Sequence, residues 1–140
     1  MITETEILVR YAETDQMGIV HHSVYPVWYE AARTDFFNQL GFRYSDMEEA
    51  GILLPLTDLS CSYKKPARYE QTVTVRTRID QFTGVRVCFF YEVIDPKSGE
   101  LLATGETRHA WTGADLKPLN LKKKKPAVYE ALRGSVETDE

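Results

Sequence analysis

Apolar and polar residues alternate along five short stretches of this chain, and a period of two is typical of β-strands. In the first stretch, Ile7, Val9 and Tyr11 alternate with Leu8 and Arg10. The other four stretches span residues 59–63, 73–79, 85–93 and 101–112. Turn-forming sequences at 83–84 and 95–99 separate the last three, so the pattern predicts antiparallel strands joined by short turns.

Between the first and second predicted strands, the spacing of apolar residues is that of a helix. The apolar and aromatic side chains on this spacing are Tyr25, Trp28, Tyr29, Ala32, Phe36 and Leu40. Ser23 is the expected N-cap, Pro26 suits the first turn, and Gly41 suits the end of a helix. We therefore predict one helix of about five turns with an aromatic face, and a second, short helix over residues 127–133.

These elements predict an α+β fold in which a five-stranded antiparallel sheet wraps around one long central helix. The chain has no internal repeat and no Gly/Ser-rich linker, so we expect residues 1–140 to form a single domain. One helix is too small to cover a whole face of five strands, and the sheet keeps open edges. We therefore expect the chain to associate with itself, at least as a homodimer.

The charge balance and the cysteines narrow the class of protein. The net charge is -4 and the pI about 5.4, which disfavours a general nucleic-acid binder because such proteins usually carry a basic excess. No signal peptide and no apolar run of about 20 residues is visible, so no membrane span is expected. Cys61 and Cys88 form no CxxC pair. We expect a reduced, cytoplasmic protein.

The segment from Arg10 to Tyr29 carries the candidate chemistry. It places Asp15 seven residues before His22, with Gly18 between them and a helix start directly after. A helix start offers unpaired amide N–H groups and a partial positive charge, which stabilise the anionic oxygen that forms when a carbonyl is attacked. A nearby carboxylate can deprotonate water or attack the carbonyl itself. These are the minimum parts of an ester or thioester hydrolase.

Structural roles for the same residues stay open. Asp15 suits a turn or a cap equally well, and His21 and His22 suit either solvent or packing. A zinc site is disfavoured because only His109 is left to complete it, and no nucleotide- or phosphate-binding glycine motif is present. The chain lacks a GxSxG elbow, and Cys61 lies in an apolar strand, where a structural thiol is the default.

From Tyr11 to Glu30 the sequence resembles the signature of hotdog-fold acyl-CoA thioesterases of the 4-hydroxybenzoyl-CoA thioesterase type. The matching residues are Asp15, Gly18, Val20, His22, Tyr25 and Tyr29–Glu30. Weaker matches extend the resemblance over most of the chain, from about residue 7 to residue 133. These weaker matches are Ser62–Tyr63 followed by Lys64–Lys65–Pro66–Ala67, the turn at Asp95, and Gly105.

The resemblance implies a hotdog fold and the hydrolysis of an acyl-CoA to a free acid and coenzyme A, without a cofactor. It makes Asp15 the catalytic carboxylate, as general base or nucleophile, and places His22 where an amide polarises the thioester carbonyl. The hydroxybenzoyl-CoA enzyme has a tyrosine there, so the histidine makes this chain more similar to the Tol–Pal-associated bacterial branch, which favours other acyl-CoAs. The resemblance also implies dimers, often paired into homotetramers, with the active site at the subunit interface.

Substrate-binding residues are expected around this segment. Gly18 and Val20 follow Asp15 in the same segment and are expected to contact the substrate. Tyr25, Trp28 and Tyr29 are expected to line an acyl pocket. Ordinary core packing is the alternative for each aromatic residue. Coenzyme A carries phosphates, so basic residues should border the cleft. The candidates on that side are Ser62, Tyr63, Lys64, Lys65 and Arg68, with Arg86 and Arg108 as weaker ones. Lys122 to Lys125 are expected to be solvated, with a phosphate- or anion-binding role as the alternative.

Two other functions stay open at this point. One is a hotdog acyl-thioester dehydratase, which also uses a histidine and a carboxylate. The other is an acyl-CoA-binding module without turnover. The thiol carrier is expected to be coenzyme A, with acyl carrier protein as the alternative.

Overall fold

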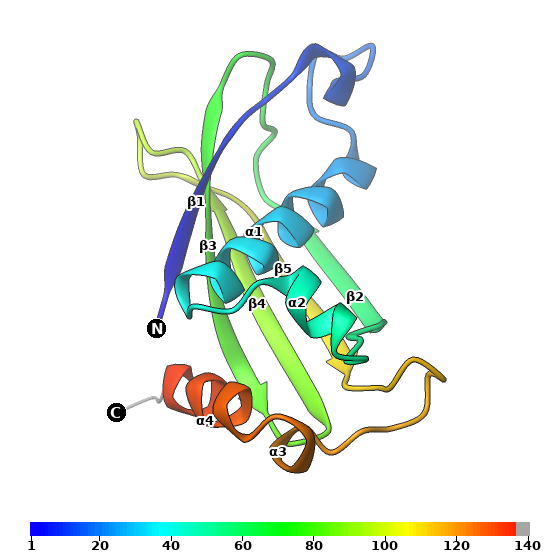
Figure 1. The fold of residues 1–140 in the computed structure, drawn as a ribbon. Coiled ribbons are helices and arrows are strands. Elements are labelled where there is room, and N and C mark those ends of the chain that lie inside the picture. Colours follow the sequence, from blue (N-terminus) through cyan, green and yellow to red (C-terminus); the bar gives the residue numbers. More distant parts are fainter. Residues whose placement is uncertain (137–140) are drawn as a thin grey trace.

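The computed structural model describes residues 1–136 and shows one antiparallel sheet that curves around a central helix (Figure 1). The strands follow the order β1-β3-β4-β5-β2 across the sheet. They are β1 (Thr3–Leu8), β2 (Leu56–Tyr63), β3 (Thr72–Phe82), β4 (Arg86–Ile94) and β5 (Leu101–Ala110). All neighbouring strands pair antiparallel, as the short predicted turns required.

The central helix α1 (Tyr25–Gln39) packs its aromatic side against the inner face of the sheet. Side chains that point inward from β4 are fully buried there, as are Phe36 and Phe37 of α1. The ring of Phe89 meets both phenylalanines edge-on, with centroids 5.7 and 6.0 Å apart. Burying each such ring contributes about 1.5–3 kcal/mol, so this contact fixes α1 on the sheet. The arrangement is the hotdog fold expected from the sequence.

Close approach of α1 to β5 depends on a glycine. A Cβ built on Gly105 would lie 2.4 Å from the Tyr29 ring, closer than any side chain tolerates. The Tyr29 ring instead stacks on Tyr91 of β4, with the centroids 4.4 Å apart. Gly105 thus lets a whole aromatic ring lie flat between the helix and the sheet.

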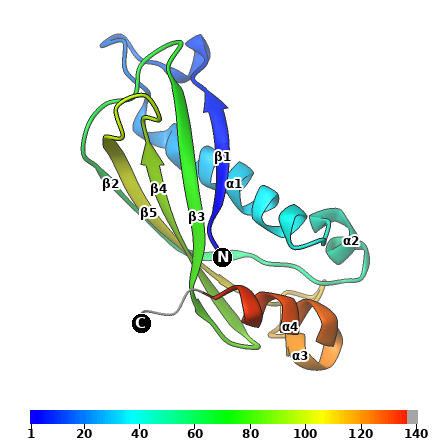
Figure 2. The same cartoon turned by 90° about the vertical axis from the view of Figure 1, so that its left-hand side faces the viewer.

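The shorter helices lie at the end of the sheet near the N-terminus. Helix α2 (Tyr44–Glu49) follows α1, and α3 (Leu121–Lys124) and α4 (Pro126–Ser135) close the described chain. Figure 2 shows the sheet and α1 as two layers, with α3 and α4 beside the lower end of the sheet and below α1. The Met1 ammonium group donates to the carbonyl of Ser135 over 2.8 Å. In the part of the chain that the structure describes, no helix has the length and hydropathy of a membrane span.

Several predicted boundaries were wrong. The first strand ends at Leu8, and Tyr11 begins a short 3₁₀ helix, η1 (Tyr11–Glu13), because the chain leaves the sheet there. Helix α2 is absent from the predicted elements, because with six residues it is too short to show a clear period. Ser23 is not the cap of α1, which follows a 3₁₀ turn, η2 (His22–Val24). Three of the four lysines from Lys122 to Lys125 belong to α3, and all four are exposed, as predicted.

One edge of the sheet carries several exposed apolar side chains. Strand β1 forms one edge and β2 the other. Strand β2 carries Leu56, Leu59 and Tyr63, whose side chains are 49%, 44% and 48% exposed. Such a row of apolar side chains along an unpaired edge is typical of a surface that a second chain covers.

Candidate active site

Asp15 occupies a tight loop between η1 and η2. Its Oδ1 accepts a hydrogen bond from the Met17 amide over 2.8 Å, and its carbonyl accepts from the Gly18 amide over 3.0 Å. Gly18 has a φ of 78°, which the turn requires and which other residues rarely adopt. The Asp15 amide in turn donates to the carbonyl of Ile19 over 2.9 Å. The loop therefore holds one carboxylate oxygen and leaves Oδ2 without a hydrogen bond among the described residues.

Glu13, which the sequence analysis did not single out, fastens this loop to α1. Its carboxylate is buried and accepts from the Arg10 amide over 2.8 Å and from the Trp28 indole N–H over 3.0 Å. Burial opposes ionisation of Glu13, but these hydrogen bonds outweigh it and lower the pKa. The backbone carbonyl of Glu13 also accepts from the His21 amide over 2.9 Å. Glu13 therefore links both ends of the Asp15 loop.

His22 begins the helical segment that leads into α1. The side chain of His21 caps it by accepting from the Ser23 amide over 3.2 Å, so histidine has the capping role predicted for serine. The carbonyl of His22 accepts from the Tyr63 hydroxyl over 2.9 Å. No acceptor within residues 1–136 pairs with the His22 amide N–H, which leaves it available at the positive end of the helix.

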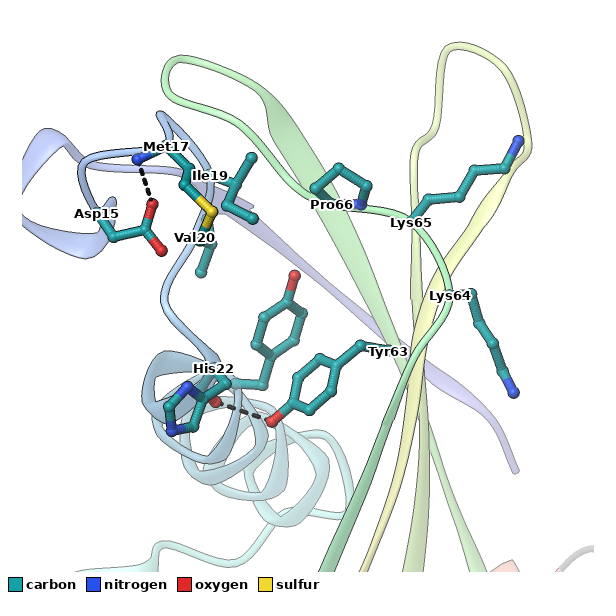
Figure 3. A pocket seen from close by; sticks show the side chains of 10 residues that line it. Asp15, Met17, Ile19, Val20, His22, Tyr63, Lys64, Lys65 and Pro66 are labelled. Carbon is teal, nitrogen blue, oxygen red and sulfur yellow. Dashed lines mark hydrogen bonds between the residues drawn. The ribbon is translucent and has the colours of Figure 1, made fainter.

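Asp15 and His22 line the same cavity, of about 360 Å³ (Figure 3). Figure 3 shows the second oxygen of Asp15 directed to the side of the cavity where Val20 and His22 lie. The lining residues are Asp15, Met17, Ile19, Val20, His22, Tyr25, Tyr63, Lys64, Lys65 and Pro66. Most of the wall is therefore apolar, with one carboxylate and one helix start facing it.

Aromatic residues divide between the cavity and the core. Tyr25 and Tyr63 line the cavity and meet edge-on, with ring centroids 5.1 Å apart. Trp28 and Tyr29, expected in the acyl pocket, do not line it; their side chains are 2% and 0% exposed. The indole of Trp28 is committed to Glu13, because α1 turns that face toward the η1 loop.

Of the predicted basic residues, two border the cavity and one does not. Lys64 and Lys65 border the cavity, and the Lys65 ammonium lies 3.2 Å from the Glu100 carboxylate. Arg68 lies in a separate hollow beside Tyr69 and Asp95, because the chain turns back toward β3 after Pro66. Ser62 is exposed on β2 outside the cavity wall, and Gly18 lines a neighbouring hollow that shares Asp15.

The histidines do not assemble a metal site in the cavity. His21 and His22 lie ring against ring at 4.1 Å, and His109 is buried on β5. One group of potential ligand atoms lies on the outer face of the sheet, where those of Asp80, Cys88 and Glu106 are within 4.8 Å of one another. Burial and the charge of Glu106 raise the pKa of the Cys88 thiol to about 11, which disfavours the thiolate that a metal requires.

Comparisons with known proteins show the family to which this chain belongs. YneP of Bacillus subtilis (strain 168), provisionally named an acyl-CoA thioesterase, is 43% identical over 131 residues, which are 93% of this chain and 94% of YneP. The crystal structure of a DHNA-CoA thioesterase from Staphylococcus aureus superposes with a TM-score of 0.91 at 41% identity, covering 95% of this chain and 89% of that one. The hypothetical protein TT1821 from Thermus thermophilus gives a TM-score of 0.89 at 39% identity, covering 99% and 100%. The family model of the thioesterase-like superfamily matches residues 9–133, and the chain belongs to that superfamily.

Proposed function

We propose that this protein is an acyl-CoA thioesterase that hydrolyses the thioester at Asp15. The observation that carries the proposal is one cavity with a carboxylate oxygen free of hydrogen bonds and an unpaired amide at a helix start. Names of the related proteins support a thioester as substrate. Both cysteines are free thiols, which supports the predicted cytoplasmic location.

In this mechanism the thioester carbonyl lies between Asp15 and His22. The His22 N–H donates to the carbonyl oxygen and stabilises the negative charge that develops on it. Asp15 either deprotonates a water that attacks the carbonyl carbon, or attacks it directly to form a mixed anhydride that water then cleaves. In both routes the carbon–sulfur bond breaks, and the products are a free acid and the thiol of coenzyme A. No metal or cofactor is required because the thioester is already activated.

A second copy of the chain completes the site in this proposal. The cavity is open, and its wall includes Tyr63 on the exposed edge strand β2. Pairing of two β2 edges would bury Leu56, Leu59 and Val27, the last of which is 56% exposed on α1. We propose a homodimer with the active site at its interface, and pairing of dimers into a homotetramer.

The proposed subgroup within the thioesterase family rests on the residues around His22. We keep the 4-hydroxybenzoyl-CoA thioesterase type, and the Tol–Pal-associated branch within it, as the predicted subgroup. Lys64 and Lys65 border the cavity, and Figure 3 shows their ammonium groups directed away from Asp15 and His22. We propose that they contact the phosphates of coenzyme A outside the mouth of the cavity. Arg68 would contact only a ligand that extends beyond Pro66 into the neighbouring hollow.

The test is a thiol-release assay over short, long, branched and aromatic acyl-CoAs, with hydroxyacyl thioesters included. We expect stoichiometric release of coenzyme A and free acid from at least one acyl class. Loss of water with the thioester intact would identify a dehydratase instead. Tight binding of every acyl-CoA with no product would identify a binding module.

A further inference from the structure

The hydroxyl of Tyr29 is a buried polar group without a partner. The side chain is fully buried, and no hydrogen bond within the described chain reaches its oxygen. After burial, the neighbouring Cys61 thiol raises the pKa of this hydroxyl by its charge and as a weak hydrogen-bond partner. The pair does not reach full hydrogen-bond geometry, so Cys61 satisfies the hydroxyl poorly. The buried hydroxyls of Thr3, Thr77 and Thr112 also lack a partner among the described residues. Tyr29 differs from them because its neighbours Tyr25 and Tyr63 line the Asp15 cavity.

The Tyr29 hydroxyl lies directly behind the wall of the Asp15 cavity. A Cβ at Gly105 would be 2.7 Å from this oxygen, and Gly105 pairs with Cys61 across β5 and β2. On β2, Cys61 precedes Tyr63 by two residues and lies on the same side of the strand. On α1, Tyr29 follows Tyr25 by one turn and lies on the same side of the helix. The Tyr25–Tyr63 pair therefore forms one layer, and Tyr29 with Cys61 forms the next layer inward.

Tyr63 is the exposed part of this wall in the single chain. It lies on an edge strand, its side chain is 48% exposed, and the hydroxyl is held by one hydrogen bond to the His22 carbonyl. Tyr25, by contrast, is buried on α1. Opening the cavity toward Tyr29 requires the Tyr63 ring to turn away from Tyr25 and to give up its hydrogen bond to the His22 carbonyl.

We propose that Tyr29 is a specificity-determining residue whose hydroxyl binds a hydroxyl or oxo group at the far end of the acyl chain, after Tyr63 moves aside. The inference rests on the proposed thioesterase function. The reacting carbonyl lies at Asp15, and the acyl group runs along α1 from Val20 past Tyr25. A compact or flat acyl group then brings its distal oxygen to Tyr29, where the missing hydrogen bond is made.

The protonation states of the tyrosines agree with this role. Burial raises the pKa of Tyr29 well above its ordinary value, and burial with the neighbouring Cys61 raises that of Tyr63 to about 12. Both phenols are neutral at physiological pH, so Tyr29 can donate as well as accept. It can thus pair with either a hydroxyl or an oxo group.

The test compares Tyr29→Phe with the parent on matched substrate pairs: benzoyl-CoA with its para-hydroxylated analogue, and a saturated acyl-CoA with its ω-hydroxy analogue. We expect the parent to prefer the hydroxylated member of at least one pair. In Tyr29→Phe, kcat/KM for that member should fall about 10-fold or more, and kcat/KM for its apolar partner should stay within about 2-fold.

Tyr91→Phe is the matched control because Tyr91 stacks on Tyr29 but has a satisfied hydroxyl, bonded to Thr107 over 2.6 Å and Arg33 over 3.1 Å. It should lower Tm without changing the substrate ratio, whereas Tyr29→Phe should leave Tm unchanged or raise it. An unchanged ratio in Tyr29→Phe, or a Tm loss equal to that of Tyr91→Phe, overturns the inference. If the parent releases no thiol from any substrate, the proposed function fails instead.

Discussion

Asp15 and Asp95 begin two turns with nearly the same local structure. In each, Oδ1 accepts from the amide two residues on, over 2.8 Å from Met17 and 2.9 Å from Lys97. In each, the aspartate carbonyl accepts from the amide of a glycine with a φ of 78°, Gly18 or Gly99. By local chemistry the two aspartates are equivalent.

Their surroundings separate them. The Asp95 turn closes the β4–β5 hairpin and borders a hollow that also contains Lys97 and Glu100. The Asp15 turn is tied to α1 through Glu13 and faces a largely apolar cavity opposite His22. The turn itself therefore does not make a site. A carboxylate becomes a candidate base only where an acyl group and an amide donor can be brought to it.

The largest expected effect comes from removing the carboxylate charge of Asp15. Asp15→Asn should lower kcat/KM for acyl-CoA hydrolysis by about 100- to 1000-fold, because asparagine is neither a base nor a nucleophile. It keeps an oxygen for the Met17 amide, so circular dichroism and Tm should change little. Asp95→Asn is the matched control and should stay within about 2-fold in the same thiol-release assay. Equal activities of the two variants would remove Asp15 from the mechanism.

A smaller effect is expected from loosening the Asp15 turn. Glu13→Ala leaves the buried Trp28 N–H without an acceptor, which costs about 2–3 kcal/mol of unfolding free energy, and frees the loop. We expect kcat to fall about 10-fold with a smaller change in KM. Glu13→Gln keeps an acceptor oxygen and should recover most of the activity.

Ser98→Ala provides the comparison in the other turn. It removes the acceptor of the Glu100 amide in an exposed hairpin, and should cost less than about 0.5 kcal/mol. Urea unfolding and steady-state kinetics measure both variants. If Glu13→Ala loses stability but keeps the parent kcat, the residue supports only the fold.

The last effect concerns the stability in acid, and it should arise in neither turn. Burial, and beyond it the charge of Arg33, lowers the pKa of His109 from 6.5 to about 4. Between these pH values the unfolded chain binds a proton that the folded protein does not, so stability is full above pH 6.5 and falls as the pH decreases toward 4. The loss from this group should be about 2 kcal/mol at pH 5.

Urea unfolding at several pH values tests this assignment. The His109→Gln variant should show a flatter pH dependence between 6.5 and 4, whatever its absolute stability. Asp95→Asn should leave that slope unchanged, since the Asp95 pKa is lowered by its turn amides and titrates below this window. A slope unaffected by His109→Gln would assign the acid sensitivity to other groups.

The strands and the central helix were predictable because their signals repeat locally. Alternation over residues 73–79 and 85–93 and the three- and four-residue spacing on α1 all reappear in the structure. The Asp15-to-His22 segment was also predictable as a place where a carboxylate precedes a helix start. Glu13 was missed because a single glutamate in a polar loop has no pattern that distinguishes a buried one from a solvated one.

The sequence by itself determined the five strands, the central helix, their order along the chain and the fold family. Period, turn residues and family signature are properties of neighbours along the chain. Only the tertiary structure decided which aromatic side chains face the cavity, so that Tyr25 and Tyr63 line it while Trp28 and Tyr29 lie behind. It also separated Lys64 from Arg68, and Asp15 from Asp95. The reason is physical: these distinctions depend on contacts between residues far apart in sequence, which the packing of α1 on the sheet creates.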